Sequence, residues 1–355
     1  MKKILLINPF GIGDVLFTTP VVRAIKETYP DCFLGYWCNE RVEPILKNNP
    51  FIDKIFTFTR GDLKKIFKKS KFEGIKKTVV LFFGIKKQRF DIAVDFSLDH
   101  RYSLTCKFAG IKRRIGFNYK SRGRFLTDKI NIEGYEDKHV VEYYLDILKF
   151  LNIDRPKELK LDLFLNKDIK EWSESFIRDL KINRPLIGIA PLGGESWGAQ
   201  AYLKHWPISN YIELIKKLIN EYNTKIILFG DENEKVIVDN LEKLLCDKVI
   251  NLAGRLFLPE YAGILSKLDI LITNDSGNIH IAGALGIKTV SIFGPVDERV
   301  YGPYPLDERH IVIKKKLACQ PCYKKFKIYD CKYELSCLKR INPQEVFEAV
   351  KRLLI

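Results

Sequence analysis

Short apolar segments alternate with longer amphipathic segments along the whole chain. The short segments are rich in β-branched residues and end at Gly, Pro, Asn or Asp, which is typical of buried parallel strands. The longer segments place apolar residues at helical spacing. The predicted strands are 3–8, 32–38, 54–58, 91–97, 185–191, 225–230, 249–254, 269–275 and 289–294. The predicted helices are 14–28, 41–48, 63–83, 101–109, 139–151, 209–222, 232–245, 259–267, 277–285 and 343–354.

The strand-helix pattern restarts after a stretch near 155–180. A chain of 355 residues is long enough for two domains. Strands that alternate with helices predict parallel sheets covered on both faces. We therefore expect an α/β protein of two Rossmann-like domains whose parallel sheets face a central cleft, with boundaries at 1–165 and 166–355. The C-terminal helix is a candidate to pack back on the first domain.

The loops that follow the strands are the places to search for chemistry. In open α/β sheets, ligands bind beyond the carboxyl ends of the strands, and two domains can line one shared cleft. The loops at those ends are 8–14, 191–206, 230–234, 254–258, 274–280 and 294–302.

The first of these loops, "NPFGIGDV", contains Gly11 and Gly13 and resembles a dinucleotide-binding loop. The position of the third glycine is occupied by Leu16, however. Glycines permit a tight turn between strand and helix. Asp14 stands at the helix start, where the helix dipole stabilises a carboxylate and where it would compete with a bound phosphate. We therefore expect Asp14 to act as a base rather than to belong to a phosphate site.

The loop "NDSGNIH" (274–280) is the better phosphate site. Asp275 or Ser276 can cap the helix that follows, and Gly277 lets a ligand approach the backbone. The N–H groups of a helix N-terminus attract an anion. An ordinary capped helix explains the same pattern without a ligand.

Two further loops of the second half carry charged candidates. Lys204 in "KHWP" is a compact cation suited to a diphosphate, although many lysines are simply solvated. In "FGDENEK" (229–235), Asp231, Glu232 or Glu234 can accept hydrogen bonds from ribose hydroxyls. Acids at a helix N-terminus also match the dipole without any ligand.

The net charge of +16 is unevenly distributed. Residues 60–89 contain eleven Lys or Arg against two acids, and residues 112–124 contain six with no acid. Such a surface attracts a polyanion: nucleic acid, anionic lipid or a phosphorylated glycan. We interpret the amphipathic basic segment 60–89 as a contact with an anionic membrane, and solvated lysine is the simpler alternative. No apolar run approaches the roughly 20 residues that span a bilayer, so we expect a cytoplasmic protein.

Eight cysteines are present, and four of them cluster late as Cys319, Cys322, Cys331 and Cys337. The first pair has the spacing of zinc ligands, but the second pair does not match the usual form. With no export signal, a disulfide framework is not expected. Reduced thiols are the first reading, and metal binding or redox chemistry is the alternative.

Together these stretches resemble glycosyltransferase family 9, the ADP-heptose:lipopolysaccharide heptosyltransferases. The resemblance covers nearly the whole chain, and the segments that carry it stand in the family's order. They are "GIGDVLFTTPVVRAIKETYP" (11–30), 91–117, 139–153, "KHWP" (204–207), "FGDENEK" (229–235), "NDSGNIHIAGALG" (274–286) and "SIFGP" (291–295).

The resemblance implies a GT-B fold in which the first half binds a glycolipid or glycan acceptor and the second half binds a nucleotide sugar, ADP-heptose. It also implies inverting transfer without a metal ion or other cofactor. Asp14 falls on the family's proposed catalytic base, and Gly11 and Gly13 lie on the acceptor-side loop. The residues expected on the donor side are Lys204 at the phosphate, Glu234 at the ribose, Asp275 with the backbone of Ser276 and Gly277, and also Ser196, Leu256 and His280. A packed, hydrogen-bonded histidine is the alternative for His280.

Two other functions compete with this interpretation. An NAD-dependent oxidoreductase would use Gly11, Gly13 and Glu40, an acid after the second strand; the leucine at position 16 and the phosphate-binding features of the second half oppose it. A nucleic-acid-binding protein would use the positive charge. The basic residues are not interleaved with any DNA- or RNA-reading motif, so we expect no nucleic-acid partner.

Overall fold

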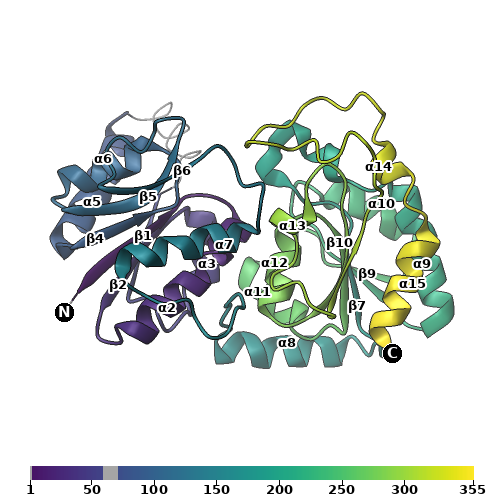
Figure 1. Cartoon of the computed structure of the whole chain (residues 1–355). Helices are drawn as coiled ribbons and strands as arrows, with labels where there is room; N and C mark the ends of the chain where they lie inside the picture. Colours follow the sequence, from purple (N-terminus) through teal and green to yellow (C-terminus); the bar gives the residue numbers. More distant parts are fainter. Residues whose placement is uncertain (1, 59–70) are drawn as a thin grey trace. The chain divides into compact units, whose positions relative to one another are not determined.

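The computed structural model describes residues 2–58 and 71–355 (Figure 1). The chain divides into two compact units, residues 1–164 and 165–355. The predicted helix 63–83 lies partly outside the described residues, since the description resumes at position 71. Within the described part the helix continues to Gln88.

The first unit is built on a six-stranded parallel sheet in the order β3-β2-β1-β4-β5-β6. Its central strand, β1, is completely apolar from Ile4 to Ile7, as a strand covered on both faces must be. The strands are β1 (Lys3–Asn8), β2 (Phe33–Cys38), β3 (Lys54–Thr57), β4 (Ile92–Asp95), β5 (Arg113–Tyr119) and β6 (Asp128–Ile132).

The second unit repeats the same topology with its own six parallel strands, in the order β12-β11-β10-β7-β8-β9. The strands are β7 (Ile187–Ala190), β8 (Ile226–Leu228), β9 (Val249–Asn251), β10 (Ile270–Asn274), β11 (Lys288–Ile292) and β12 (His310–Ile313). Both sheets are therefore doubly wound. The strand order reverses between β1 and β4 in one unit and between β7 and β10 in the other, and such switch points are where ligands bind.

Helices cover both faces of the first sheet (Figure 1). On one face, α5 and α6 pack through Ile85, Tyr102 and Cys106 onto the alternate strand residues that include Leu5 and Ile7. On the other face, α2 and α7 pack together. The helices are α1 (Ile12–Leu16), α2 (Thr19–Thr28), α3 (Glu43–Leu46), α5 (Lys71–Gln88), α6 (His100–Phe108) and α7 (Val140–Leu145), with 3₁₀ turns η1 (Glu40–Val42) and η2 (Asp146–Leu151).

In the second unit, α9, α10 and α15 share one apolar core with the sheet, and α8 packs on α11. The C-terminal helix α15 thus contacts α9 and the strands β10–β12 of its own unit. The helices are α8 (Lys167–Asp179), α9 (Ile208–Tyr222), α10 (Lys235–Leu245), α11 (Leu258–Leu265), α12 (Gly277–Ala284), α13 (Glu298–Tyr301), α14 (Ser336–Lys339) and α15 (Pro343–Leu354), with 3₁₀ segments η3 (Glu195–Lys204) and η4 (Cys246–Lys248).

A buried ion pair fastens the connecting segment to the first unit. Arg23 on α2 pairs with Asp162 at 2.8 Å, and its guanidinium also donates to the carbonyls of Glu158 and Lys160. The backbone N–H of Asp162 donates to Thr19 Oγ1 at 2.9 Å. These bonds explain why the chain up to residue 164 stays with the first unit although it has left the sheet.

The predicted helix 14–28 is two helices, α1 and α2. Pro20 lies in the first turn of α2 and has no N–H to donate to the preceding turn. Thr18 and Thr19 instead donate their hydroxyls to the carbonyls of Val15 and Leu16. The break leaves α1 as one short turn that carries Asp14.

Several strands and helices were not predicted: β5, β6, β12, α8, α13 and α14. β5 begins with Arg113 and Arg114, so it lacks the apolar run of a central strand, and β6 is a half-exposed edge strand. Gly116 in β5 has a structural reason, because a Cβ there would lie 2.4 Å from the carbonyl oxygen of Asp95 on the neighbouring strand. Packing therefore overrides local propensity at these strands.

Candidate functional site

Asp14 lies at the carboxyl end of β1, beside the switch point of the first sheet. Asn8, the last residue of β1, is fully buried and fixes the loop that carries it. Its side-chain amide donates to the carbonyl of Asp14 at 2.9 Å and accepts from the N–H of Phe10 at 3.1 Å. A rigid strand end thus positions Asp14, whose side chain is half-buried.

Gly11 and Gly13 do not make the turn by unusual backbone angles. Gly11 has φ −79° and ψ −176°, and neither glycine has a positive φ. The expected strand-to-helix turn is present, but its φ angles do not by themselves require glycine at either position. A Cβ at Gly11 would lie 3.9 Å from Asp14 Oδ2, an ordinary van der Waals contact, so Gly11 lies beside the carboxylate without being sterically required there.

Buried aromatic residues line the protein side of this loop. The hydroxyls of Tyr36 on β2 and Thr18 lie 2.6 Å apart. Burial raises the pKa of Tyr36 and of Tyr144 on α7 well above the ordinary value, and the negative charge of Asp14 adds to the rise for both. The carboxylate therefore lies within electrostatic reach of two neutral phenols in a poorly solvated wall, where a charge acts strongly.

A second carboxyl group, Asp95, ends β4 on the other side of the switch point. It is 5% exposed and accepts a hydrogen bond from the N–H of Ser97 at 2.9 Å. Burial raises the pKa of Asp95 to about 7, against the lowering effect of Ser97. The first sheet thus presents two carboxyl groups at the carboxyl ends of its strands. Asp95 is buried, and Asp14 is the more exposed of the two.

Asp95 leads to a prediction on pH dependence. An unfolded Asp has a pKa of about 3.9, so the folded state holds the proton more tightly, and its stability falls as pH rises from about 4 to about 7. We expect Asp95→Asn to become more stable relative to the native protein across this window, by on the order of 3 kcal/mol between pH 4 and pH 7. Urea unfolding at a series of pH values measures it, and a difference that stays constant with pH would contradict it.

In the second unit, Lys204 and Asp275 meet at the switch point between β7 and β10. Their side chains form an ion pair at 2.8 Å and are 10% and 5% exposed. The Lys204 ammonium also lies 4.2 Å from the centre of the Trp197 ring, in cation-π contact. An ammonium carries three N–H donors, of which the ion pair uses one, so Lys204 retains the capacity to bind an anion.

Asn274, the last residue of β10, holds the surrounding loops together. It is fully buried, and its amide donates to the carbonyl of Pro191 at 2.6 Å. Its oxygen accepts from the N–H of Trp206 at 3.2 Å and from the hydroxyl of Tyr211 at 3.0 Å. Asn274 therefore fixes both ends of the 191–206 loop, as Asn8 fixes the loop after β1.

Of the two predicted capping residues of α12, Ser276 is the N-cap. Its hydroxyl accepts a hydrogen bond from the N–H of Asn278 at 3.4 Å. Gly193 lies directly against it. Gly193 has φ +98°, and a Cβ there would lie 2.6 Å from Ser276 Cβ. Only glycine fits, so the 192–194 loop and the helix N-terminus approach closely.

Glu234 is tied to the same loop. Its carboxylate accepts from the N–H of Gly193 at 2.5 Å and from the N–H of Asp231 at 3.0 Å. Each oxygen has a second lone-pair direction, so the group can still accept from a ribose hydroxyl. The structure thus brings together Lys204, Glu234, Asp275, Ser276 and Gly277 around one turn, Gly193.

The remaining predicted residues differ in accessibility. Ser196 is exposed on η3, and Leu256 is half-buried in the loop between β9 and α11. His280 on α12 is 6% exposed and packs inside the unit. Asn8, Asn274 and Asp95 were missed by the sequence analysis. The signal was present, because each is a polar residue that ends an otherwise apolar strand.

The late cysteines are free thiols. Burial raises the pKa of Cys322 to about 11, with further contributions from Cys319, Cys337 and Cys331, so the four lie near one another. Among the described residues, no group of three or more His, Cys, Asp or Glu side chains is arranged to hold a metal ion. None of the described helices is long and apolar enough to cross a bilayer.

Comparison with known proteins agrees with this geometry. Residues 80–333 match glycosyltransferase family 9 (heptosyltransferase). The chain is 27% identical to lipopolysaccharide heptosyltransferase 2 of Escherichia coli (strain K12), over 99% of each protein. The solved structure of E. coli ADP-heptose lps heptosyltransferase II superposes with a TM-score of 0.75 at 23% identity, and the match covers 100% of this chain and 98% of that one.

A second solved structure is more similar in shape. The glycosyl transferase family 9 protein from Veillonella parvula DSM 2008 has a TM-score of 0.82 at 19% identity, with coverage of 99% and 97%. Both structures share the GT-B fold of two Rossmann-like units. The family match excludes the oxidoreductase alternative as the chain's activity. The chain belongs to glycosyltransferase family 9 and is a glycosyltransferase.

Proposed function

We propose that the protein transfers a heptose from ADP-heptose to a hydroxyl group of a lipopolysaccharide core or related glycan. The observation that supports this most is the chemistry of the two switch points. One carries a half-buried carboxylate, Asp14, and the other carries a cation, Lys204, beside a helix N-terminus. Two of the three relatives described above are named as lipopolysaccharide heptosyltransferases, and one of these two is named for ADP-heptose.

In this mechanism Asp14 is the general base. An acceptor hydroxyl is a weak nucleophile at neutral pH, and a positioned carboxylate removes its proton as the new bond forms. The acceptor oxygen attacks the anomeric carbon from the side opposite the diphosphate. The bond from that carbon to the diphosphate oxygen breaks, and ADP leaves with the electron pair, so the configuration inverts.

The second unit stabilises the leaving group. The leaving diphosphate gains negative charge, and the Lys204 ammonium and the N–H groups at the start of α12 would meet it there. Asp275 holds Lys204 in place from the side. Because a preformed cation already occupies this position, we infer that transfer proceeds without a metal ion. Glu234, Ser196, Leu256 and His280 complete the proposed donor side.

An anionic acceptor fits the first unit. The turn after β5 carries three exposed cations, Lys120, Arg122 and Arg124. Like Asp14, they lie at the carboxyl ends of the strands of the first sheet. Such cations attract phosphate groups of a charged glycan. They lie away from the apolar core, so their charges face solvent.

A panel of sugar nucleotides tests the donor. We expect an ADP-sugar to raise the melting temperature more than UDP- or GDP-sugars at equal concentration, because only a ligand that binds the folded state stabilises it. Isothermal titration with ADP alone should show the same preference over UDP and GDP. A preference for UDP or GDP would remove the ADP-heptose assignment while leaving glycosyl transfer intact.

We also propose that the enzyme works in the cytoplasm with peripheral contact to an anionic membrane, since the proposed acceptor is a glycolipid. Helix α5 exposes Ile75, Val79, Val80 and Phe83, and exposed lysines stand at both ends of this apolar face. Phe82 of the same helix packs inward against the core and is not part of this exposed face. An interfacial helix of this kind binds by apolar burial and by attraction to anionic lipid.

Vesicle flotation measures this contact. We expect binding to vesicles that contain phosphatidylglycerol and a steep loss at high salt, because exposed charges are screened within about 8–10 Å near physiological ionic strength. Val80→Glu/Phe83→Glu should abolish flotation. Equal binding to neutral phosphatidylcholine vesicles would contradict the electrostatic part of the proposal.

A further inference from the structure

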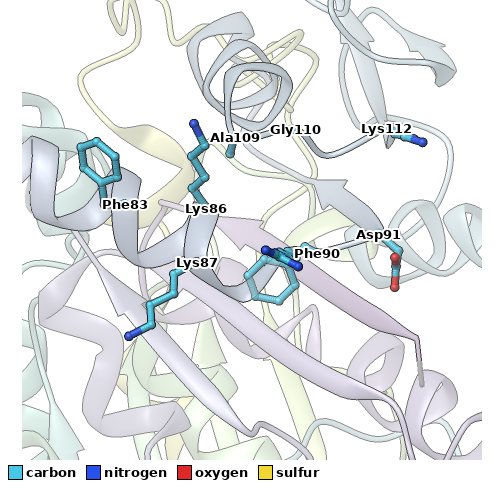
Figure 2. Close-up of a pocket in the computed structure, with 9 residues that line it drawn as sticks. Phe83, Lys86, Lys87, Phe90, Asp91, Ala109, Gly110 and Lys112 are labelled. Atoms are coloured by element: carbon cyan, nitrogen blue, oxygen red, sulfur yellow. The ribbon is translucent and has the colours of Figure 1, made fainter.

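A separate pocket lies at the amino ends of the strands of the first sheet, whereas Asp14 lies at their carboxyl ends. It has a volume of about 810 Å³ and is formed where α5 ends, where β4 begins and where the 109–112 turn leads into β5 (Figure 2). These are the amino ends of the strands. A strand rises about 3.3 Å per residue, so β4 is roughly 10 Å long. The pocket at its amino end is therefore at least that far from Asp95 at its carboxyl end.

The pocket is strongly positive. Four cations line it, Lys86, Lys87, Arg89 and Lys112, against one carboxylate, Asp91. Asp91 is engaged elsewhere, because its carboxylate accepts the backbone N–H of Lys3 at 2.8 Å. Within the described part of the chain, no carboxylate forms an ion pair with any of the four cations. Among residues 2–58 and 71–355, no acid therefore neutralises these charges through an ion pair.

The floor of the pocket is apolar and packed against the core. Phe90 is 4% exposed and packs against Phe33 and Phe56, at ring-centre distances of 6.1 and 5.9 Å. A low-dielectric wall beneath a group of like charges focuses their field on the space above it. Phe83, which is 58% exposed, stands at the rim.

The turn between α6 and β5 leaves room above this floor. Gly110 has φ +87°, and a Cβ added there would meet no atom within 4 Å. Figure 2 shows Lys86 and Lys87 leaving α5 in opposite directions, with Lys86 extending toward Ala109. Of these two lysines, Lys86 therefore points toward the 109–112 turn and can approach an anion there, whereas Lys87 points away from it.

We propose that this pocket is a binding site for a phosphate group, distinct from the transfer site and carried by an anionic ligand. The ammonium group of lysine and the guanidinium group of arginine are common phosphate ligands in proteins. Two kinds of ligand could supply the phosphate group. One is an anionic phospholipid, whose acyl chains would contact the apolar rim at Phe83, and the other is a free phosphorylated small molecule. The site goes beyond glycosyl transfer and does not depend on it.

The experiment compares two double variants of α5 that change the net charge equally. Lys86→Gln/Arg89→Gln removes two cations from the pocket, and Lys76→Gln/Lys77→Gln removes two exposed cations from the same helix outside it. Titration of the native protein with glycerol 3-phosphate and with inorganic phosphate, followed by amide NMR shifts, should show one saturable site. The pocket variant should weaken it by about 10-fold or more, and the control variant by much less.

A second arm uses vesicles of phosphatidylglycerol in phosphatidylcholine to distinguish the sources. If the pocket variant loses vesicle affinity about 10-fold more than the control, the ligand is the lipid phosphate. If only glycerol 3-phosphate binding responds, the ligand is a free phosphate compound. Equal losses in both variants, or no saturable binding of either probe, would overturn the proposal. An unchanged urea-unfolding transition shows that the first unit of the pocket variant remains folded, and unchanged ADP affinity keeps this test separate from that of the proposed donor site.

Discussion

Replacing Asp14 by Asn should abolish most of the turnover while donor binding stays intact. The amide keeps the shape of the carboxylate but cannot accept the proton of the acceptor hydroxyl, so we expect kcat to fall by about 10²–10⁴-fold. The proposed donor groups, Lys204 and Asp275, lie in the other unit, so the dissociation constant for ADP should not change. Steady-state transfer assays and isothermal titration measure the two quantities.

A matched variant separates charge loss from loss of the base. Asp91→Asn makes the same chemical change in the same unit, but at the amino edge of the sheet, where no transfer chemistry is proposed. We expect its kcat to stay near the native value. Near-normal turnover of Asp14→Asn would remove Asp14 from the role of base, whatever the control shows.

Removing Lys204 should harm stability and transfer together, and the two effects can be separated. Lys204→Met leaves Asp275 buried without its cation, and such a break costs about 3–5 kcal/mol. Lys204→Met/Asp275→Asn removes both charges and should recover most of that stability. Transfer should remain reduced by about 10²–10³-fold, because no cation is left to meet the leaving diphosphate.

The first unit offers a control with equal burial. The Arg23–Asp162 pair is 7% and 6% exposed, against 10% and 5% for Lys204–Asp275. Arg23→Met should therefore destabilise the protein by a similar amount in urea unfolding and leave ADP affinity unchanged. If the Lys204→Met/Asp275→Asn variant regains transfer along with stability, Lys204 is a structural residue and not part of donor chemistry.

The two sites share a construction that local sequence reasoning did not find. Each switch point has a buried asparagine at the end of its central strand, Asn8 or Asn274, whose amide bonds fix the loop that carries the charged residue. An asparagine after an apolar strand reads as a turn former. Its role as a clamp depends on loops that arrive from elsewhere in the chain.

The sequence by itself determined the strand-helix alternation, the repeat of that pattern in two halves, and the position of Asp14, Lys204 and the 274–277 loop at strand ends. These follow from periodicity and from short-range turn chemistry, which act over a few residues. The break at Pro20 also has a local cause, the missing N–H of proline, but the sequence analysis predicted one continuous helix over 14–28. The strands β5 and β6 could not be predicted in this way, because their own residues do not form an apolar run and packing against neighbouring elements decides their structure.

Only the tertiary structure decided which loops meet. The order β3-β2-β1-β4 places Asp95 beside the Asp14 loop, and the adjacency of β7 and β10 brings Lys204 to Asp275. The raised pKa of Asp95 and the positive pocket at residues 86–112 likewise depend on burial and on facing elements. Strand order and burial are set by long-range packing, and the energy of a charged group depends on everything around it, so a local pattern cannot contain them.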